Sequence, residues 1–253
     1  NVTFIDPLEL VDLPGTNKLV IVGKTGFVWT IDNDATTSQK TVFLDISAKT
    51  KTGIDSGLMG IAFHPDFGKA GSPNKGYFYV MYRYRFEAGY GGKEGYIRVS
   101  RYTVPDGSNV ADEDSELVLI QQYERHEFHL GGGMCFDNEG FLFISYGDEG
   151  AARDSFNSSQ KINEGFFSGV LRIDVDLDAS RSHPIRRQPQ NPANPPRNSW
   201  PDSYSANYYV PNDNPWVNAN GSVLEEFYAI GLRNVFKMTY DSEAAQLWGG
   251  GVG

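Results

Sequence analysis

The stretch Gly133-Met-Cys-Phe-Asp-Asn-Glu-Gly-Phe-Leu-Phe-Ile-Ser-Tyr-Gly147 contains two short apolar runs that are separated by a polar turn. Each run has the length of a β-strand, and the Asp, Asn and Gly residues between them are typical of a chain reversal. Glycine supplies the backbone conformations that tight turns need, and aromatic residues fit a pleated, half-buried surface. The stretch therefore predicts a β-hairpin.

The pattern of strand, polar turn and strand recurs at residues 8–23, 60–80 and 235–249. Further strand candidates lie between these copies, for example at residues 97–104 and 170–175, whereas amphipathic helical periods are hard to find. Repeats of a hairpin with additional outer strands are typical of β-propeller blades. We therefore predict an all-β fold, a β-propeller of four-stranded blades, with about three and a half to four blades in this chain.

The copies lie farther apart than a usual blade of roughly 40–50 residues, so long loops must be inserted between strands. The longest expected loop covers about residues 177–221, which are rich in Pro, Asn and Ser. Trp200, Tyr208 and Trp216 favour an ordered loop that packs on the surface. We expect residues 1–253 to form a single propeller domain that is incomplete at its C-terminal end.

The charge and the cysteine content exclude several kinds of partner and site. The 253 residues include 32 Asp and Glu against 22 Lys and Arg, for a net charge of −10. This acidic balance argues against nucleic acid or an anionic membrane surface as partner. No apolar run approaches the roughly 18 residues of a membrane span. The single cysteine, Cys135, excludes an intrachain disulfide and a zinc site built on cysteines.

The densest group of titratable side chains is His126-Glu127-Phe128-His129. Its spacing is not that of a zinc-protease helix, in which two histidines lie four residues apart around a glutamate. One interpretation is that both histidines are solvated loop residues. The other is functional, because His129 precedes an expected innermost strand whose end would meet the mouth of the central channel. A histidine there is suited to general-base catalysis near neutral pH.

Three alternating carboxylates, Asp174, Asp176 and Asp178, match the start of an EF-hand calcium loop. The sixth and twelfth positions of that loop would be Ala179 and Ile185, where calcium binding needs Gly and Glu. The sequence favours a simpler interpretation, a strand whose Asp side chains lie on one face and whose apolar side chains lie on the other.

The segment Asp55-Ser-Gly-Leu-Met-Gly-Ile-Ala-Phe-His-Pro-Asp-Phe67 resembles a characteristic block of the glucose/sorbosone dehydrogenases. These are soluble quinoproteins that depend on pyrroloquinoline quinone (PQQ). Four further blocks resemble the family in the same order. They are His129-Leu-Gly-Gly followed by Gly147-Asp148, Gly169-Val-Leu-Arg-Ile-Asp-Val-Asp176, Tyr209-Val-Pro-Asn-Asp-Asn-Pro-Trp216 and Tyr228-Ala-Ile-Gly-Leu-Arg-Asn234. Together the blocks cover nearly the whole chain.

The resemblance implies a six-bladed propeller in the parent family, with PQQ over the channel mouth and a Ca²⁺ ion that holds the quinone. A sugar, an aldose or a sorbosone-like compound, would be oxidised above the quinone at its anomeric hydroxyl or aldehyde carbon. Electrons would then pass to an external acceptor. Enzymes of this type work outside the cytoplasm, so a periplasmic or extracellular location is implied.

Six residues match functional positions of the family. His129 matches the general base, which removes a proton from the sugar hydroxyl while hydride passes to the quinone. Arg233 and Asn234 match residues beside the cofactor. The remaining matches are Asp55 and Glu149 at sugar-contacting positions, and Gly253 at a backbone carbonyl that binds calcium.

The sequence also departs from the family pattern. Val235 stands where the family has proline, Val170 replaces a lysine, and Glu149 replaces an amide-bearing residue. The chain stops at Gly253, before the later blades that supply basic residues for the PQQ carboxylates. We therefore expect an N-terminal part of a PQQ-dependent sugar dehydrogenase that has no PQQ activity on its own.

Two other functions remain open, because a fold alone does not determine function. The first is a non-catalytic propeller that binds a protein, as the Hedgehog-interacting protein does on this scaffold. The second is a lactonase-like propeller in which an axial metal activates water, with Asp55, Glu149 and Asn234 as part of the ligand ring.

Overall fold

The structure is a computed structural model that describes residues 2–85, 95–150, 152–189, 204 and 206–252. Two antiparallel sheets of four strands each follow one another along the chain. The first consists of β1 (Pro7–Leu13), β2 (Lys18–Gly23), β3 (Phe27–Asp32) and β4 (Thr41–Asp45). The second consists of β5 (Leu58–Phe63), β6 (Tyr77–Tyr84), β7 (Gly95–Thr103) and β8 (Asp112–Glu124).

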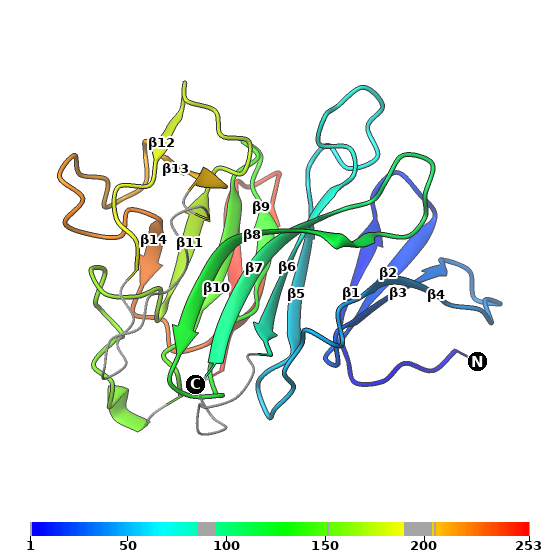
Figure 1. The fold of residues 1–253 in the computed structure, drawn as a ribbon, viewed down its shortest axis with the longest axis horizontal. Coiled ribbons are helices and arrows are strands. Elements are labelled where there is room, and N and C mark those ends of the chain that lie inside the picture. The colour runs from blue at the N-terminus through cyan, green and yellow to red at the C-terminus, as the bar shows by residue number, and fades with distance from the viewer. Residues whose placement is uncertain (1, 86–94, 151, 190–203, 205, 253) are drawn as a thin grey trace.

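A third four-stranded sheet and a hairpin complete the main series. The third sheet consists of β9 (Met134–Phe136), β10 (Leu142–Tyr146), β11 (Gly169–Ile173) and β14 (Phe227–Ile230). The hairpin consists of β15 (Val235–Asp241) and β16 (Gln246–Gly251). A short 3-10 turn, η1 (Ala152–Asp154), lies in the connection that follows β10. Figure 1 shows the sheets side by side in chain order, from β1–β4 at one side to β11 and β14 at the other.

Each repeat found in the sequence forms the first two strands of a sheet. The stretch 133–147, for example, forms β9 and β10, with Leu142 opposite Phe136 and Ile144 opposite Met134. Three four-stranded sheets and one hairpin account for the described strands of the main series. The predictions of an all-β fold, of four-stranded blades and of about three and a half to four blades are confirmed.

The strands of the second sheet are apolar on both faces because that sheet packs against the first sheet on one side and the third sheet on the other. On β6, Phe78, Val80 and Tyr82 pack into a cluster shared with the first sheet. The alternate residues Tyr79 and Met81 pack into a cluster shared with the third sheet. Since successive side chains of a strand point to opposite faces, one continuous apolar run serves two interfaces. This arrangement explains why the sequence shows uninterrupted apolar runs.

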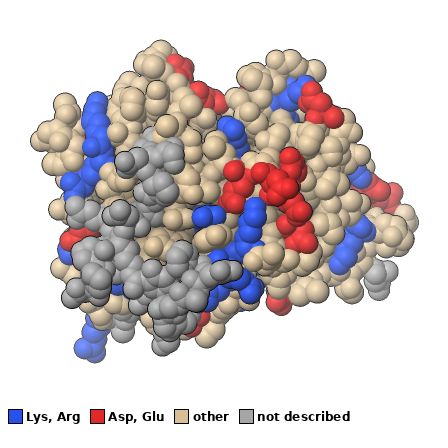
Figure 2. All heavy atoms as spheres, in the orientation of Figure 1, with Lys and Arg blue, Asp and Glu red and all other residues tan. Residues whose placement is uncertain are grey.

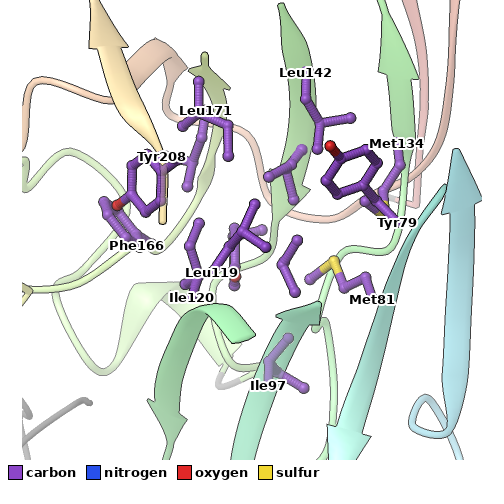
Figure 3. Packing of buried hydrophobic residues seen from close by; sticks show 14 of the residues in the cluster. Tyr79, Met81, Ile97, Leu119, Ile120, Met134, Leu142, Phe166, Leu171 and Tyr208 are labelled. Carbon is purple, nitrogen blue, oxygen red and sulfur yellow. The ribbon is translucent and has the colours of Figure 1, made fainter. Parts of the chain in front are cut away.

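The main core lies between the second and third sheets (Figure 3). Side chains of β6, β7 and β8 meet those of β9, β10 and β11 there, and they exclude water. The labelled members are Tyr79, Met81, Ile97, Leu119, Ile120, Met134, Leu142, Phe166, Leu171 and Tyr208, each at most 5% exposed. Burial of this kind contributes about 25 cal/mol for each Å² of apolar surface removed from water.

The segment 177–221 contains a small sheet of its own. Strands β12 (Ser182–Pro184) and β13 (Tyr209–Pro211) pair in antiparallel fashion. Tyr208 is fully buried in the main core, and Asn207 Nδ2 donates to the carbonyl oxygen of Val118 at 2.7 Å. Trp216 packs partly against the same core, whereas Trp200 lies outside the described residues.

The prediction of a strand with alternating Asp residues at 174–178 is wrong. Strand β11 ends at Ile173, and the carboxylate of Asp174 accepts hydrogen bonds from the backbone N–H groups of Asp176 and Asp178. Leu177 has a positive φ of 59°. The segment is therefore a turn organised by a buried carboxylate, since Asp side chains compete for nearby backbone N–H groups in this way.

Within the described part of the chain, no helix has the length and apolar character of a membrane span.

Acidic and basic side chains lie beside one another on the surface (Figure 2). The exposed start of β8 carries Asp112, Glu113 and Asp114. Farther along β8, the carboxylate of Glu116 lies 3.3 Å from Lys49 Nζ and 3.7 Å from Arg98 Nη1. The acidic side chains of this region are thus partly neutralised by neighbouring cations.

Candidate functional site

The candidate site lies where several inner strands begin. Strands β5, β9 and β15 are the first strands of consecutive sheets, and β5 and β15 both contact β9. Because the two strands of a hairpin run in opposite directions, the residue that follows β10 lies at the same edge as the residue that precedes β9. Four loops therefore meet at one end of the inner strands. They carry Asp55, His129, Asp148 and Asn234.

His129 is held in this loop cluster by its ring and by its backbone. Its Nδ1 atom lies 2.7 Å from Asp148 Oδ1, and its backbone N–H donates to Asp55 Oδ2 at 3.4 Å. The His129 side chain is 12% exposed, so it is not fully closed off from solvent. Because an ionised carboxylate only accepts hydrogen bonds, Nδ1 carries a proton and Nε2 of the neutral ring carries a lone pair. This arrangement suits a general base.

Asp148, the partner of the His129 ring, has no role predicted from the sequence. Its carboxylate is 7% exposed, and Oδ1 also accepts from the backbone N–H of Gly150 at 2.9 Å. The backbone N–H of Asp148 donates to the carbonyl oxygen of Arg233. A fixed carboxylate orients the imidazole and favours one tautomer. The signal in the sequence was the Gly147-Asp148 pair, which directly follows the predicted strand.

Asn234 and Arg233 reach the cluster from the loop before β15. Asn234 is buried, and its Oδ1 accepts from the backbone N–H of Gly131 at 3.1 Å. It therefore holds the glycine-rich segment that follows His129. Arg233 is exposed, and its Nη1 donates to the carbonyl oxygen of Val252 at 3.0 Å. The guanidinium has five N–H donors, so others remain for an anionic ligand at this position.

Asp55 lies at the rim of the cluster, in the loop before β5. It is partly exposed, and it lies beside a cavity of about 80 Å³ lined by Ile54, Met59 and Phe236 among others. Ile54 is 69% exposed. A carboxylate beside an apolar surface suits the hydroxyl groups and the apolar face of a sugar ring.

Glu149 is placed differently from the other site residues. Its side chain is fully buried, and both carboxylate oxygens accept hydrogen bonds from Arg125. Burial raises the pKa of Glu149, and the Arg125 guanidinium opposes that rise. Contact between Glu149 and a sugar stays a prediction, and it would require the carboxylate to leave Arg125.

Unusual backbone conformations gather at the same loops. His129, Glu149 and Ser168 have positive φ angles of 52°, 63° and 53°. A positive φ costs of order 1–3 kcal/mol for a residue other than glycine and persists only where the surroundings enforce it. Ser168 is fully buried, and its backbone N–H donates to the carbonyl oxygen of Gly147. The packing therefore holds these loops in one geometry.

The family resemblance implies that PQQ and a Ca²⁺ ion bind near these residues. Arg233 is an exposed cation at the cluster and fits an anionic ligand such as the carboxylated quinone PQQ. In the described part of the chain, no group of three or more His, Cys, Asp and Glu side chains could hold a metal ion. The predicted calcium ligand, Gly253, lies outside the described residues.

A larger groove of about 700 Å³ lies away from His129 and is lined by Phe143, Arg172 and Tyr228 among others. The Arg172 guanidinium lies within 3.4 Å of three carboxylates, those of Asp137, Glu139 and Asp213. Its charge is thus matched within the protein, and none of the described residues that line this groove is a histidine.

Comparison with known proteins gives two kinds of relative. The family model for Glucose / Sorbosone dehydrogenase matches residues 4–194. The Hedgehog-interacting protein of Mus musculus is 32% identical over 170 residues, which are 65% of this chain and 23% of that protein. The HIPL2 protein of Arabidopsis thaliana is 25% identical over 263 residues, covering 90% of this chain and 35% of that protein. The chain thus spans about a quarter to a third of these curated relatives.

Solved structures of sugar dehydrogenases share the fold. A glucose dehydrogenase superposes with a TM-score of 0.65 at 20% identity, covering 97% of this chain and 61% of the other. The soluble aldose sugar dehydrogenase from Escherichia coli, in its apo form, gives 0.66 at 19% identity, with coverages of 98% and 58%. A PQQ-bound aldose sugar dehydrogenase from Streptomyces coelicolor gives 0.62 at 17% identity, with coverages of 98% and 56%. Because the family model matches most of this chain, the chain belongs to the glucose/sorbosone dehydrogenase family.

Proposed function

We propose that the protein takes part in the PQQ-dependent oxidation of a sugar at its anomeric hydroxyl or aldehyde carbon. The observation that carries this proposal is the hydrogen bond of 2.7 Å between His129 Nδ1 and Asp148 Oδ1, in a loop cluster that also holds Asp55 and Arg233. The carbon that bears the reacting hydroxyl of the sugar cannot lose hydride readily while that hydroxyl keeps its proton. A base that faces the substrate is therefore the group that the reaction requires from the protein.

The chain's own residues would act in three ways. His129 Nε2 would take the proton of the reacting hydroxyl, because Asp148 holds the other ring nitrogen in its protonated form. Asp148 would also stabilise the imidazolium that results. Asp55 would accept a hydrogen bond from another hydroxyl of the sugar and so orient the ring, since its carboxylate is partly exposed beside His129.

Arg233 and Asn234 would serve the cofactor side of the site. PQQ, when bound, accepts the hydride from the sugar carbon. Arg233 would bind its anionic groups through the donors that Val252 does not use. Asn234 would hold Gly131 in place, and thereby the segment that carries His129. No step is assigned to Ca²⁺, and its proposed ligand is the backbone carbonyl of Gly253.

The proposal includes a small-molecule sugar as substrate, an external electron acceptor and a periplasmic or extracellular location. Support for the substrate class and the cofactor comes from family membership and from the fold shared with a PQQ-bound aldose sugar dehydrogenase. The location follows only from the proposed chemistry.

A second candidate function is protein binding without catalysis. The 32% identity to the Hedgehog-interacting protein over 65% of this chain favours it. The lactonase-like alternative has less support, because the Glu149 carboxylate is bound to Arg125 and the Asn234 Oδ1 atom accepts from Gly131. The Glu149 carboxylate would have to leave Arg125 before it could bind an axial metal.

The test uses the full-length protein, PQQ and Ca²⁺, a panel of aldoses and sorbosone-like sugars, and an artificial electron acceptor. We expect sugar-dependent reduction of the acceptor, and its loss in His129→Ala. A PQQ titration followed by absorbance is run in parallel, because a pure binding module would show no affinity for the quinone. The proposal would be refuted if none of the sugars supported reduction of the acceptor, or if His129→Ala kept full activity.

A further inference from the structure

Two neighbouring carboxylates hold the segment that carries His129. Residues 147–150, Gly-Asp-Glu-Gly, are called here the acidic loop, and residues 125–129 are called the histidine segment. Asp148 of the acidic loop contacts the His129 ring, as described above. Glu149, the next residue, contacts Arg125 at the other end of the histidine segment. The two segments are therefore joined at both ends.

Glu149 binds both the backbone and the side chain of Arg125. Glu149 Oε1 accepts from the backbone N–H of Arg125 at 2.7 Å, and Oε2 accepts from Arg125 Nε at 2.8 Å. Arg125 Nη2 also donates to Oε2. Because the carboxylate binds backbone and side chain of the same residue, it fixes the position of the histidine segment as well as the charge of Arg125.

The two glycines of the acidic loop allow this close approach. A Cβ atom at Gly147 would overlap the carbonyl oxygen of His129, and one at Gly150 would overlap the side chain of Phe128. Gly150 also has a φ of 80°, which favours glycine. The backbone of the acidic loop thus lies directly against the backbone of the histidine segment, with no side chain between them.

Arg125 is the cation beside two buried carboxyl groups, those of Glu124 and Glu149. Glu124 is also buried, and its Oε2 atom has no hydrogen-bond partner in the described residues. Burial and the nearby Glu149 carboxylate raise the pKa of Glu124, whereas Arg125 and Arg83 lower it. The Arg125 guanidinium lies 3.9 Å from the centre of the Phe156 ring, which further restricts its position. Without this cation, two buried carboxyl groups would lose a nearby positive charge.

We propose that Arg125 and Glu149 are positioning residues that fix the backbone of the histidine segment, so that Asp148 can hold the His129 ring with Nε2 facing the substrate. The inference rests on the proposed role of His129 as a base. It also explains how the positive φ angles of His129 and Glu149 are maintained, because hydrogen bonds on both sides hold these residues. Neither Arg125 nor Glu149 needs to touch the sugar.

The test compares two chemically matched substitutions in the full-length protein. Glu149→Gln removes the charge from a buried carboxylate bound to an arginine. Glu225→Gln does the same to a carboxylate that is 2% exposed and lies 3.1 Å from Arg186 Nη1, in the turn that precedes β14. Both variants are examined by ¹⁵N NMR of the histidine rings, by thermal unfolding and by steady-state kinetics.

We expect Glu149→Gln to change the tautomer signals of His129 and to lower kcat by about 100-fold with little change in KM, as for a misplaced catalytic group. Glu225→Gln should change neither. Arg125→Lys keeps the charge but not the forked geometry, so its His129 signals should lie between wild type and Glu149→Gln. It also provides the test if Glu149→Gln does not fold.

The inference is overturned if His129 keeps its wild-type tautomer in Glu149→Gln, or in Arg125→Lys where only that variant folds. It is also overturned if Glu225→Gln alters His129 to the same extent. The NMR result is independent of turnover. If the wild-type protein oxidises no sugar, the proposed function fails, while the tautomer signals still decide whether Arg125 and Glu149 position His129.

Discussion

The ammonium group of Lys237 lies 3.0 Å from the carboxylate of Glu9, although 228 residues separate them in the chain. Lys237 lies on β15 and Glu9 on β1, the innermost strands of the last and first described sheets of the main series. Lys237 Nζ also donates to the carbonyl oxygen of Met59 on β5 at 2.8 Å. The inner strands therefore converge closely enough for one side chain to join three of them.

This convergence predicts the effect of Lys237→Met. Partial burial already raises the pKa of Glu9, and Lys237 opposes that rise, so the substitution leaves a carboxylate that is only 15% exposed without its cation. We expect the free energy of unfolding of the full-length protein to fall by about 2 kcal/mol at pH 7, measured by urea denaturation. The cost is below that of a fully buried pair because Lys237 is 31% exposed. A double variant, Glu9→Leu with Lys237→Met, should recover most of the loss. A double variant as unstable as the single one would contradict this account.

Asp148→Asn should affect catalysis more than stability. Asparagine keeps the size of the side chain but loses the charge that favours the Nδ1-protonated ring and stabilises the imidazolium. We expect kcat for sugar oxidation to fall by about 100-fold or more. His129→Ala should fall at least as far, and the double variant no further, since the two residues act as one unit. Additive losses in the double variant would show that Asp148 acts independently of His129.

Arg233→Ala tests the cofactor side of the site. Arg233 is exposed and its guanidinium has donors beyond the one that binds Val252. Loss of one charge-assisted contact should weaken PQQ binding by at least about 10-fold, as measured by titration. Lys18→Ala is a suitable control, because Lys18 is a partly exposed cation on β2 whose partner is Asp32. Equal PQQ affinities for Arg233→Ala and wild type would remove Arg233 from the cofactor site.

Glu226 predicts a pH dependence of stability. Burial raises the pKa of Glu226 to about 7, and the Tyr208 hydroxyl, which donates to Glu226 Oε1 at 2.8 Å, limits that rise. The folded protein therefore holds this proton more tightly than the unfolded chain. Stability from this group is complete below the ordinary glutamate pKa and is lost as pH rises through about 7.

The loss from Glu226 amounts to about 3 kcal/mol between the two limits. Glu226→Gln should remove this part of the pH dependence, so that the variant gains stability relative to wild type at pH 8 compared with pH 5. Tyr208→Phe removes the hydrogen bond that favours the charged form and should move the loss to higher pH. Chemical denaturation at several pH values measures both effects. Identical pH profiles for wild type and Glu226→Gln would show that Glu226 stays ionised in the folded protein.

The fold was predictable from the sequence because its signals are local. The repeat at 133–147 forms β9 and β10, and the repeat at 235–249 begins β15 and continues into β16. The alternation of side chains and the turn residues between runs act within a few positions of the chain. The turn at Asp174 was not predicted, because a carboxylate that bonds backbone N–H groups leaves the same sequence pattern as a strand.

The candidate site was predictable only in part. The position of His129 before an inner strand was visible in the sequence, and the loops of Asp55 and Asn234 do reach it. The partner of the His129 ring was not visible, since Asp137, Asp148 and Glu149 all lie within about 20 residues of it. The burial of Glu149 against Arg125 was not visible either, because burial depends on how separate loops pack.

The sequence by itself determined the strands, the hairpins and the type of sheet, because backbone conformation follows from short-range patterns of apolar, aromatic and turn residues. It also supplied the histidine that a base requires. The tertiary structure decided which carboxylate holds His129, which arginine Glu149 binds, and that Lys237 meets Glu9. These contacts join residues from 19 to 228 positions apart. Such pairings depend on the twist of the sheets and on the packing of side chains between them, which no local pattern encodes.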